Sequence, residues 1–268
     1  MNGKTAETIT RIALLGAAGR MGRTILELAR DYPGVTIAAA VVPAGRVPAE
    51  PSPGCAWSTD LRAALLAGDV LLDFSVPACT AAAVDACVAA GKPLVTGVTG
   101  LDDATRGKLA TASRRIAVLA APNMSLGANL LLALTRTAAA ALGQDYDLEI
   151  TDIHHRAKRD APSGTALALA EAAAAARHVR LEDHVTFTRR GASAPRRPGS
   201  IGMASVRAGD AAGEHRVLFG GTAESLEFTH RAASRAAFAR GALAAAKWIV
   251  GRPAGEYSMA AVLNLPVS

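Results

Sequence analysis

The stretch "RIALLGAAGRMGR", residues 11–23, decides the fold of the first half of the chain. It begins as a short apolar run ending in glycine, which is typical of a buried strand, and continues with apolar residues at helical spacing. Gly16, Gly19 and Gly22 occupy the turn between the two. Such a turn lets the backbone approach a pyrophosphate at the free N–H groups of a helix N-terminus. The alternative is a tight turn that needs glycine only for packing.

Apolar runs and helical segments alternate through the first 125 residues. Further strands are expected at 35–42, 69–75, 92–97 and 116–122, and helices at 61–68, 79–91 and 101–113. Because polar residues do not alternate within these strands, the pattern predicts a parallel sheet covered by helices on both faces. The proline-rich segment 43–58 is expected to be a loop. The sequence therefore predicts an α/β fold with an N-terminal Rossmann-like dinucleotide-binding domain.

The pattern changes near residue 145. Strands of mixed polarity are expected at 146–155, 184–190, 201–209, 214–221 and 224–232, with one helix among them at about 163–177. A single helix leaves one sheet face short of cover, so we expect a partner's sheet to cover it in a homo-oligomer. A long amphipathic helix follows at 234–251. We expect a dinucleotide-binding domain at 1–125, completed by 235–268, and an α+β mixed-sheet domain for substrate binding and oligomerisation at 126–234.

The charge of the chain leaves nucleic acid as a partner to be considered. The net charge is +6, and five of the 29 basic residues are lysine, so the rest are arginine. The densest basic stretch, 189–200, lacks the interleaved aromatic residues on which bases stack. We therefore expect a mobile, solvated loop there and no nucleic-acid partner.

Other features indicate a cytoplasmic protein. The three cysteines have no metal-ligand spacing and fit reduced thiols, so no metal site is expected. The N-terminus lacks the apolar core of a signal peptide. The apolar stretch 129–142 is interrupted by Arg136, so it is not expected to span a membrane.

A second candidate site lies in "HHRAKRDAPSGTAL", residues 154–167. His154, His155 and Lys158 come just before Ser163, where a helix is expected to begin. Helix N–H groups, imidazoles and an ammonium together suit a small dicarboxylate, and His or Lys can supply the proton that accompanies a hydride. The alternative is that Ser163 is an ordinary helix N-cap with solvated bases before it.

Six motifs in this order resemble the 4-hydroxy-tetrahydrodipicolinate reductase (dihydrodipicolinate reductase) family across essentially the whole chain. They are "GAAGRMGR" (16–23), "DFSVP" (73–77), "TGVTG" (96–100), "APNMSLGANLL" (121–131), "DIHHRAKRDAPSGTAL" (152–167) and "IGMASVRAGDAAGEHRVLFGG" (201–221). The resemblance implies reduction of dehydrated hydroxy-tetrahydrodipicolinate to tetrahydrodipicolinate with NADH or NADPH, on the route to diaminopimelate and lysine. It also implies a homotetramer built through the C-terminal sheet.

The resemblance also implies roles for individual residues. His154 matches the proton donor or acceptor of the family, and Lys158 matches its proton donor. The substrate-binding positions are His155, Gly164 and Thr165. The dinucleotide-binding positions are Gly16, Ala17, Ala18, Gly19, Arg20, Met21, Gly97, Val98, Thr99, Ala121, Pro122, Asn123 and Met124.

The choice between NADH and NADPH stays open. Val42 and Pro43 stand where an acidic residue usually ends the second strand and binds the ribose of NAD. Without that carboxylate, Arg20, Arg23 or Arg46 could reach a 2′-phosphate. Two other functions also remain: another NAD(P)-dependent amino-dicarboxylate dehydrogenase, and a redox sensor or nucleic-acid binder that has lost the chemistry.

Overall fold

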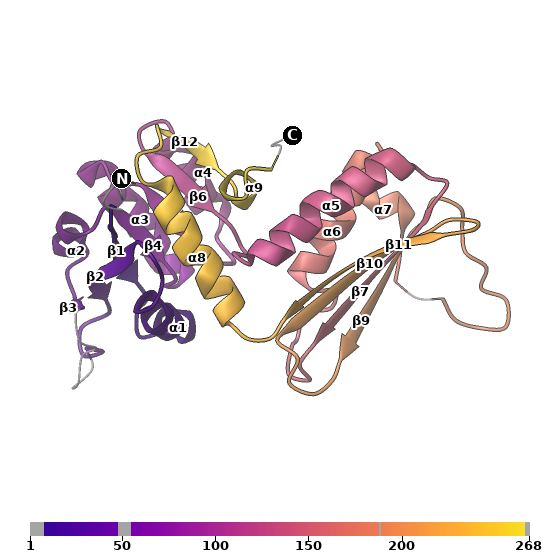
Figure 1. Cartoon of the computed structure of the whole chain (residues 1–268), viewed down its shortest axis with the longest axis horizontal. Helices are drawn as coiled ribbons and strands as arrows, with labels where there is room; N and C mark the ends of the chain where they lie inside the picture. The colour runs from indigo at the N-terminus through magenta and orange to yellow at the C-terminus, as the bar shows by residue number, and fades with distance from the viewer. Residues whose placement is uncertain (1–7, 48–54, 188, 266–268) are drawn as a thin grey trace, which may run out of the picture. The chain divides into compact units, whose positions relative to one another are not determined.

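The computed structural model describes residues 8–47, 55–187 and 189–265. The chain divides into two compact units. Unit 1 comprises Met1–Leu126 and Arg235–Ser268, and unit 2 comprises Gly127–Ser234 (Figure 1). Each unit has its own sheet and its own hydrophobic core.

The described part of unit 1 contains a seven-stranded sheet in which every pairing is parallel. Its strand order is β12-β6-β5-β4-β1-β2-β3. The strands are β1 (Thr10–Leu15), β2 (Val35–Val41), β3 (Ala56–Ser58), β4 (Val70–Asp73), β5 (Leu94–Thr96), β6 (Ala117–Ala120) and β12 (Gly255–Tyr257). The five long apolar runs are confirmed as parallel strands. The prediction of a loop at 43–58 is wrong for β3, which pairs with β2; residues 48–54 lie outside the described residues.

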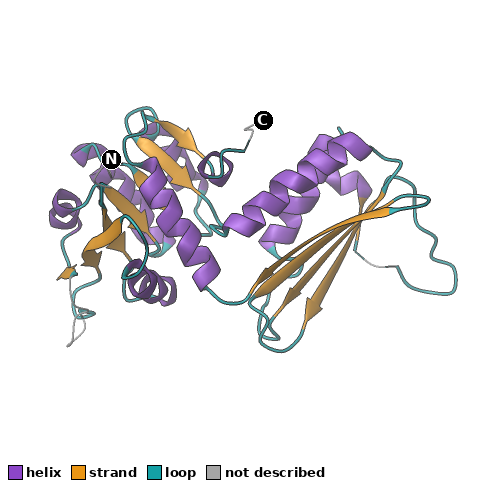
Figure 2. Ribbon diagram, in the orientation of Figure 1, coloured by secondary structure: helices purple, strands orange, loops and turns teal. Residues whose placement is uncertain are grey.

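Helices cover both faces of this sheet, as the apolar strands predict (Figure 2). Successive residues of β1 point to opposite faces: Ile12 and Leu14 lie in one core, and Ala13 lies in the other. The first core contains residues of α1 and α8, and the second contains residues of α2, α3 and α4. The helices of unit 1 are α1 (Arg20–Ala29), α2 (Leu61–Ala67), α3 (Pro77–Ala90), α4 (Asp103–Ala112), α8 (Ala236–Ile249) and α9 (Met259–Val262).

Unit 2 has a mixed sheet of five strands in the order β11-β10-β7-β9-β8. The strands are β7 (Asp147–His154), β8 (Val185–Thr186), β9 (Ile201–Arg207), β10 (Gly213–Gly220) and β11 (Ser225–Ala232). β7 and β8 run parallel to β9, whereas β10 runs antiparallel to β7 and β11. The mixed sheet is confirmed, although β8 is much shorter than the strand expected at 184–190.

The helices of unit 2 are α5 (Leu126–Leu142), α6 (Gly164–Ala176) and α7 (Leu181–His184). The prediction of one helix among the strands is wrong, because the short α7 follows α6. Apolar residues of α5 and α6 pack with residues of β7, β9 and β10 in one core, so both helices lie on one face of the sheet (Figure 1). No helix in the described residues is long and apolar enough to cross a bilayer.

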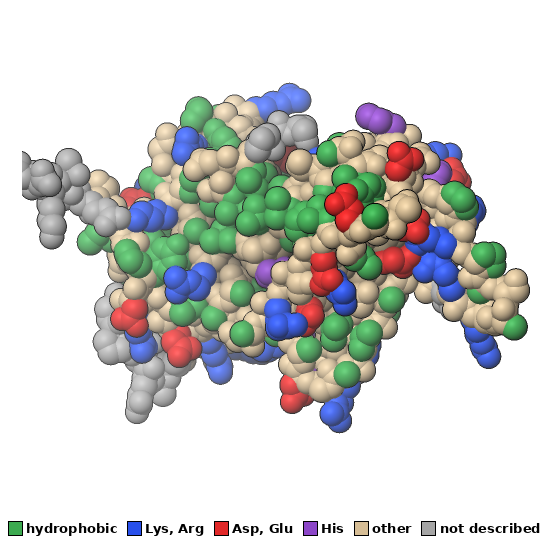
Figure 3. Space-filling model, turned by 45° about the vertical axis from the view of Figure 1, so that its right-hand side comes forward, with side chains coloured by type: hydrophobic (Ala, Val, Ile, Leu, Met, Phe, Trp, Pro, Cys, Tyr) green, Lys and Arg blue, Asp and Glu red, His purple; other side chains and the backbone are tan. Residues whose placement is uncertain are grey.

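The basic stretch 189–200 is not simply solvated. Arg189 donates to Glu149 at 2.7 Å, and Arg196 forms an ion pair with Asp147 at 2.7 Å. The side chain of Arg196 is only 19% exposed, so the prediction of a solvated loop is wrong for this residue. On the face shown in Figure 3, basic and acidic side chains are interspersed. These arginines therefore tie the stretch to β7.

The turn between β1 and α1 requires glycine at two positions where backbone segments approach closely. Gly16 has a φ of +86°, and a Cβ there would lie 2.5 Å from the carbonyl oxygen of Phe74. A Cβ at Gly22 would lie 2.3 Å from the carbonyl oxygen of Gly16. Both neighbours are backbone atoms that cannot rotate away, so a side chain at either position forces the turn apart.

We therefore expect Gly22→Ala to destabilise the protein by about 1–3 kcal/mol, the usual cost of overpacking. Gly107→Ala is the matched control, because Gly107 lies in α4 and a Cβ there meets nothing within 4 Å. Alanine there is expected to add about 0.5–1 kcal/mol of stability. Thermal unfolding of the two variants measures the difference, and a Gly22→Ala protein as stable as the unmodified chain would contradict the close approach.

Candidate active site

The polar site of unit 2 lies at the end of the same strand, β7, that supplies residues to its hydrophobic core. Alternate residues of a strand point to one face, and on β7 these are Leu148, Ile150, Asp152 and His154. The first two are buried in the core of unit 2. The last two are also buried. One strand thus supplies the core at one end and polar groups at the other.

The pairing register sets further polar residues beside Asp152. Ser205 of β9 and His215 of β10 are its partners on the two sides, and His230 of β11 is the partner of His215. Directly paired residues share a face, so these four side chains form a row across the sheet. His154, two residues beyond Asp152, is paired with Arg207.

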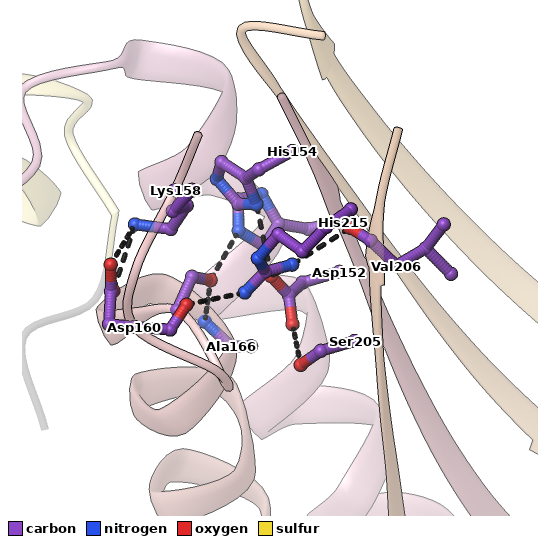
Figure 4. Close-up of polar contacts among 10 residues, drawn as sticks. Asp152, His154, Lys158, Asp160, Ala166, Ser205, Val206 and His215 are labelled. Carbon is purple, nitrogen blue, oxygen red and sulfur yellow. Dashed lines mark hydrogen bonds and ion pairs between the residues drawn. The ribbon is translucent and has the colours of Figure 1, made fainter. Parts of the chain in front are cut away.

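The carboxylate of Asp152 is fully buried and accepts three donors (Figure 4). They are Ser205 Oγ at 2.5 Å, Arg207 Nη1 at 3.0 Å and His154 Nδ1 at 3.0 Å. Burial alone would raise the pKa of Asp152, but the hydrogen bond from Ser205 and the charge of Arg207 hold that pKa below its ordinary value. Asp152 is therefore an ionised acceptor.

This carboxylate fixes the tautomer of His154. An ionised carboxylate only accepts hydrogen bonds, so His154 Nδ1 carries the proton and Nε2 is left for other contacts. Burial and the charge of Lys158 lower the pKa of His154, and they outweigh the opposing effect of Asp152. The imidazole is thus neutral near pH 7, with an acceptor at Nε2.

The loop after β7 carries Lys158, whose Nζ lies 2.8 Å from both carboxylate oxygens of Asp160. Arg207 holds this loop to the sheet, because its Nη2 donates to the carbonyl oxygen of Asp160 at 2.6 Å while its Nη1 binds Asp152. His155 is half-buried in the same loop, and its N–H donates to the carbonyl oxygen of Ala211. The position of the Lys158 ammonium is therefore fixed by its ion pair with Asp160 on the same loop.

The N-terminus of α6 closes the site from the other side. Ser163 is the N-cap, and its Oγ accepts the N–H of Ala166 at 3.2 Å. The same oxygen lies 3.1 Å from Nε2 of His215. A Cβ on Gly164 would meet no atom within 4 Å, so the space beside this residue is open. Thr165 follows in the first turn of α6. The structure thus contains the N-cap and also the open helix terminus that an anion site requires.

Six of these polar residues were not identified from the sequence: Asp152, Asp160, Ser205, Arg207, His215 and His230. Asp152 could have been found, because it lies two residues before His154 and a strand repeats every two residues. Asp160 lies on the loop of Lys158, and the remaining four reach the site through strand register. Among the described residues, no group of three His, Cys, Asp or Glu side chains could hold a metal ion.

The candidate dinucleotide residues of unit 1 gather at one sheet edge. Residues 16–21 follow β1, residues 97–99 follow β5 and residues 121–124 follow β6. Because the strands are parallel, their carboxyl ends meet at the same edge. The N–H of Gly97 donates to the carbonyl oxygen of Asp73, and the N–H of Ala121 donates to that of Thr96. The N–H of Gly16 likewise donates to the carbonyl oxygen of Val41, so all three segments are hydrogen-bonded to neighbouring strands.

This edge fits the phosphates of a dinucleotide. Gly19 is the N-cap of α1 and provides no side-chain acceptor for the first N–H groups of the helix. Ala17 and Met124 are buried in the core of unit 1, so only their backbone groups can face a ligand. Val42, which follows β2, is also buried, and Pro43 and Arg46 after it are exposed. Arg20, the first residue of α1, is exposed as well.

Family models match both units of the chain. The model described as dihydrodipicolinate reductase, N-terminus, matches residues 10–124, and the one described as dihydrodipicolinate reductase, C-terminus, matches residues 127–263. The chain belongs to the dihydrodipicolinate reductase family. The predicted resemblance is confirmed.

Relatives named 4-hydroxy-tetrahydrodipicolinate reductase cover nearly the whole chain. The protein from Thiobacillus denitrificans is 45% identical over 95% of this chain and 98% of its own. The protein from Anaeromyxobacter dehalogenans is 45% identical over 96% of this chain and 98% of its own. Membership of the dihydrodipicolinate reductase family therefore holds for both units of the chain.

Solved structures show the same fold. The dipicolinate-bound dihydrodipicolinate reductase from Paenisporosarcina sp. TG-14 has a TM-score of 0.78 and 22% identity, covering 94% of this chain and 98% of that one. GenD2 from gentamicin A biosynthesis, in complex with NAD, has a TM-score of 0.57 and 14% identity, covering 94% and 90%. The chain thus shares its fold with both of these proteins.

Proposed function

We propose that this protein reduces the dehydrated form of 4-hydroxy-tetrahydrodipicolinate to tetrahydrodipicolinate with NADH or NADPH, in the cytoplasmic synthesis of diaminopimelate and lysine. Membership of the dihydrodipicolinate reductase family supports this reaction. The observation that carries it is the arrangement in unit 2. A buried Asp152–His154 pair and Lys158 lie near the open N-terminus of α6, which suits reduction of an anionic substrate with proton transfer.

The substrate is a dicarboxylate in this proposal. Ser163, Gly164 and Thr165 bind one carboxylate at the N-terminus of α6, where backbone N–H groups and the helix dipole favour an anion. Lys158 and His155 lie on the loop before it, where the ammonium neutralises remaining charge and the imidazole can donate a hydrogen bond. Dipicolinate, bound by the Paenisporosarcina reductase, is a compound of this class.

The dinucleotide would lie at the sheet edge of unit 1, on the backbone of residues 16–21, 97–99 and 121–124. When bound, the reduced nicotinamide supplies a hydride. Gly16 and Gly19 let the backbone approach the pyrophosphate, and the N-terminus of α1 provides N–H donors for it.

The proton comes from unit 2. A hydride that arrives at one carbon of the substrate leaves negative charge on the neighbouring atom, which must be protonated. Lys158 carries a transferable proton, and His154 takes up or releases a proton at Nε2. Asp152 stabilises the imidazolium when it forms, because its carboxylate stays bonded to Nδ1. The buried pair is thus suited to proton transfer with little reorganisation.

We also propose a homotetramer formed through the sheet of unit 2. α5 and α6 lie on one face of this sheet, and Val206 on the other face is 42% exposed. A second sheet placed on that face would bury it. Light scattering at micromolar concentration is expected to give the mass of four chains, and a monomer would contradict this arrangement.

The activity is tested by following the oxidation of NADH and NADPH with freshly generated hydroxy-tetrahydrodipicolinate. We expect both cofactors to support turnover within about tenfold of each other, because the end of β2 has neither a carboxylate that favours NAD nor an arginine pair for a 2′-phosphate. No oxidation with either cofactor would refute the proposed function. A preference above about a hundredfold would instead reveal a selecting residue, with Arg20 and Arg46 as the first candidates.

The proton-transfer roles predict the behaviour of substitutions. Lys158→Gln and His154→Gln should each reduce kcat by about 10²–10⁴-fold, the usual contribution of general acid catalysis, and leave NADH binding unchanged. Lys158→Arg should be nearly as damaging, because arginine keeps its charge but does not release its proton.

Lys108 provides the matched control, since its Nζ pairs with Asp85 on the surface of unit 1 at 2.7 Å. Lys108→Gln and Lys108→Arg should leave steady-state kinetics unchanged. If Lys158→Arg retained most of its activity, Lys158 would be an electrostatic contact for the substrate carboxylate, and His154 alone would transfer the proton.

A further inference from the structure

His215 has no role in the function proposed above, yet it lies between the two halves of the substrate site. Its ring meets that of His154 edge-on, with centroids 5.3 Å apart and an interplanar angle of 74°. Its Nε2 is 3.1 Å from Ser163 Oγ, at the N-terminus of α6. His215 lies on β10, is only 4% exposed and contacts both the imidazole of His154 and the hydroxyl of Ser163.

The hydrogen bond between His215 and Ser163 can run in either direction. If Ser163 donated to Nε2, the proton of the neutral imidazole would sit on Nδ1, which is buried with no partner among the described residues. If Nε2–H donates to Ser163, only a lone pair remains unsatisfied at Nδ1. Buried N–H groups without acceptors are rarer than buried acceptors without donors. The second direction is therefore favoured.

This direction determines what the Ser163 hydroxyl can do. Its oxygen then accepts two hydrogen bonds, from the N–H of Ala166 and from Nε2 of His215. Both lone pairs are used, and the hydroxyl proton is left to donate. The space beside the adjacent Gly164 is open, so an acceptor can enter there.

We infer that His215 is a positioning residue that holds the Ser163 hydroxyl as a hydrogen-bond donor to a substrate carboxylate. This inference rests on the proposed function, because it needs an anion at the N-terminus of α6. His215 acts through Ser163 and does not itself touch the substrate.

Two further observations fit this role. Burial, followed by repulsion from His154 when that ring is protonated, lowers the pKa of His215 to about 4, so the ring is neutral and carries a single proton near pH 7. The ring is also confined between two others, since His230 stacks on it at 6.3 Å with an interplanar angle of 21°. A neutral ring that is held in place keeps its single proton on Nε2 and continues to donate it to the hydroxyl oxygen of Ser163.

The experiment compares His215→Leu, which removes the donor, with His215→Gln, whose amide N–H can occupy the place of Nε2. Calorimetric titration with dipicolinate measures the anion site without turnover. We expect His215→Leu to weaken dipicolinate binding about tenfold and His215→Gln to stay within about threefold of the unmodified protein. NADH affinity, measured in the same proteins, should not change, since the dinucleotide residues belong to unit 1.

The same pair of substitutions in a Ser163→Ala background completes a double-mutant cycle. His215→Leu should have no further effect there, because the hydroxyl that it orients is gone. His178→Asn is the control, since His178 is an exposed histidine of unit 2 and asparagine tolerates its φ of +55°. Thermal unfolding and NADH binding verify that each variant is folded.

Two results would overturn the inference. Equal losses in the presence and absence of Ser163 would show that His215 contributes packing only. A His215→Gln protein as weak as His215→Leu would show that the donor is not what matters. If the unmodified protein bound dipicolinate but these comparisons failed, only the inference would fall. If it neither bound dipicolinate nor oxidised NADH or NADPH with the substrate, the proposed function would fall with it.

Discussion

The buried carboxylate of Asp152 is the constraint on which the site depends. An isolated charge in a protein interior costs several kcal/mol, about as much as a whole domain can tolerate losing, so it must be matched by well-placed donors. Those donors come from Ser205 and Arg207 on β9 and from His154 on β7 itself. Meeting this one requirement aligns two strands, fixes the tautomer of an imidazole and, through the second nitrogen of Arg207, holds the loop that carries Lys158.

The fold was predictable where burial shaped the sequence. A parallel strand covered on both faces is apolar at most positions, so the five central strands of unit 1 appear as largely apolar runs. The short strands β3 and β12 could not be found in this way, because three residues such as "AWS" or "GEY" carry no period and become strands only by pairing with a neighbour. The arginines of 189–200 were misjudged for a related reason: their partners Asp147 and Glu149 lie some forty residues earlier, and only the folded chain brings the charges together.

The site was predictable where its residues are contiguous. The block from His154 to Thr165 was found because a histidine pair, a lysine and a helix start follow one another in the sequence. Ser205, Arg207 and His215 carry no such signal, since each is one polar residue in a strand of mixed polarity. Their positions follow from the pairing of β7 with β9 and β10, and shifting that register by one residue would point every one of these side chains to the opposite face.

The two candidate proton-transfer groups differ in how firmly they are held. His154 is buried, its Nδ1 is fixed by Asp152, and its strand continues into the core through Ile150. Lys158 lies on a loop with its side chain 21% exposed, and its bonds go to a carboxylate that is itself largely exposed. In the proposed function, a substrate carboxylate competes with Asp160 for the ammonium, because Asp160 is exposed to water and its ion pair is weak, whereas the carboxylate of Asp152 is buried and bound by three donors. The structure thus combines an imidazole fixed by a buried carboxylate with an ammonium whose partner Asp160 is exposed on a loop.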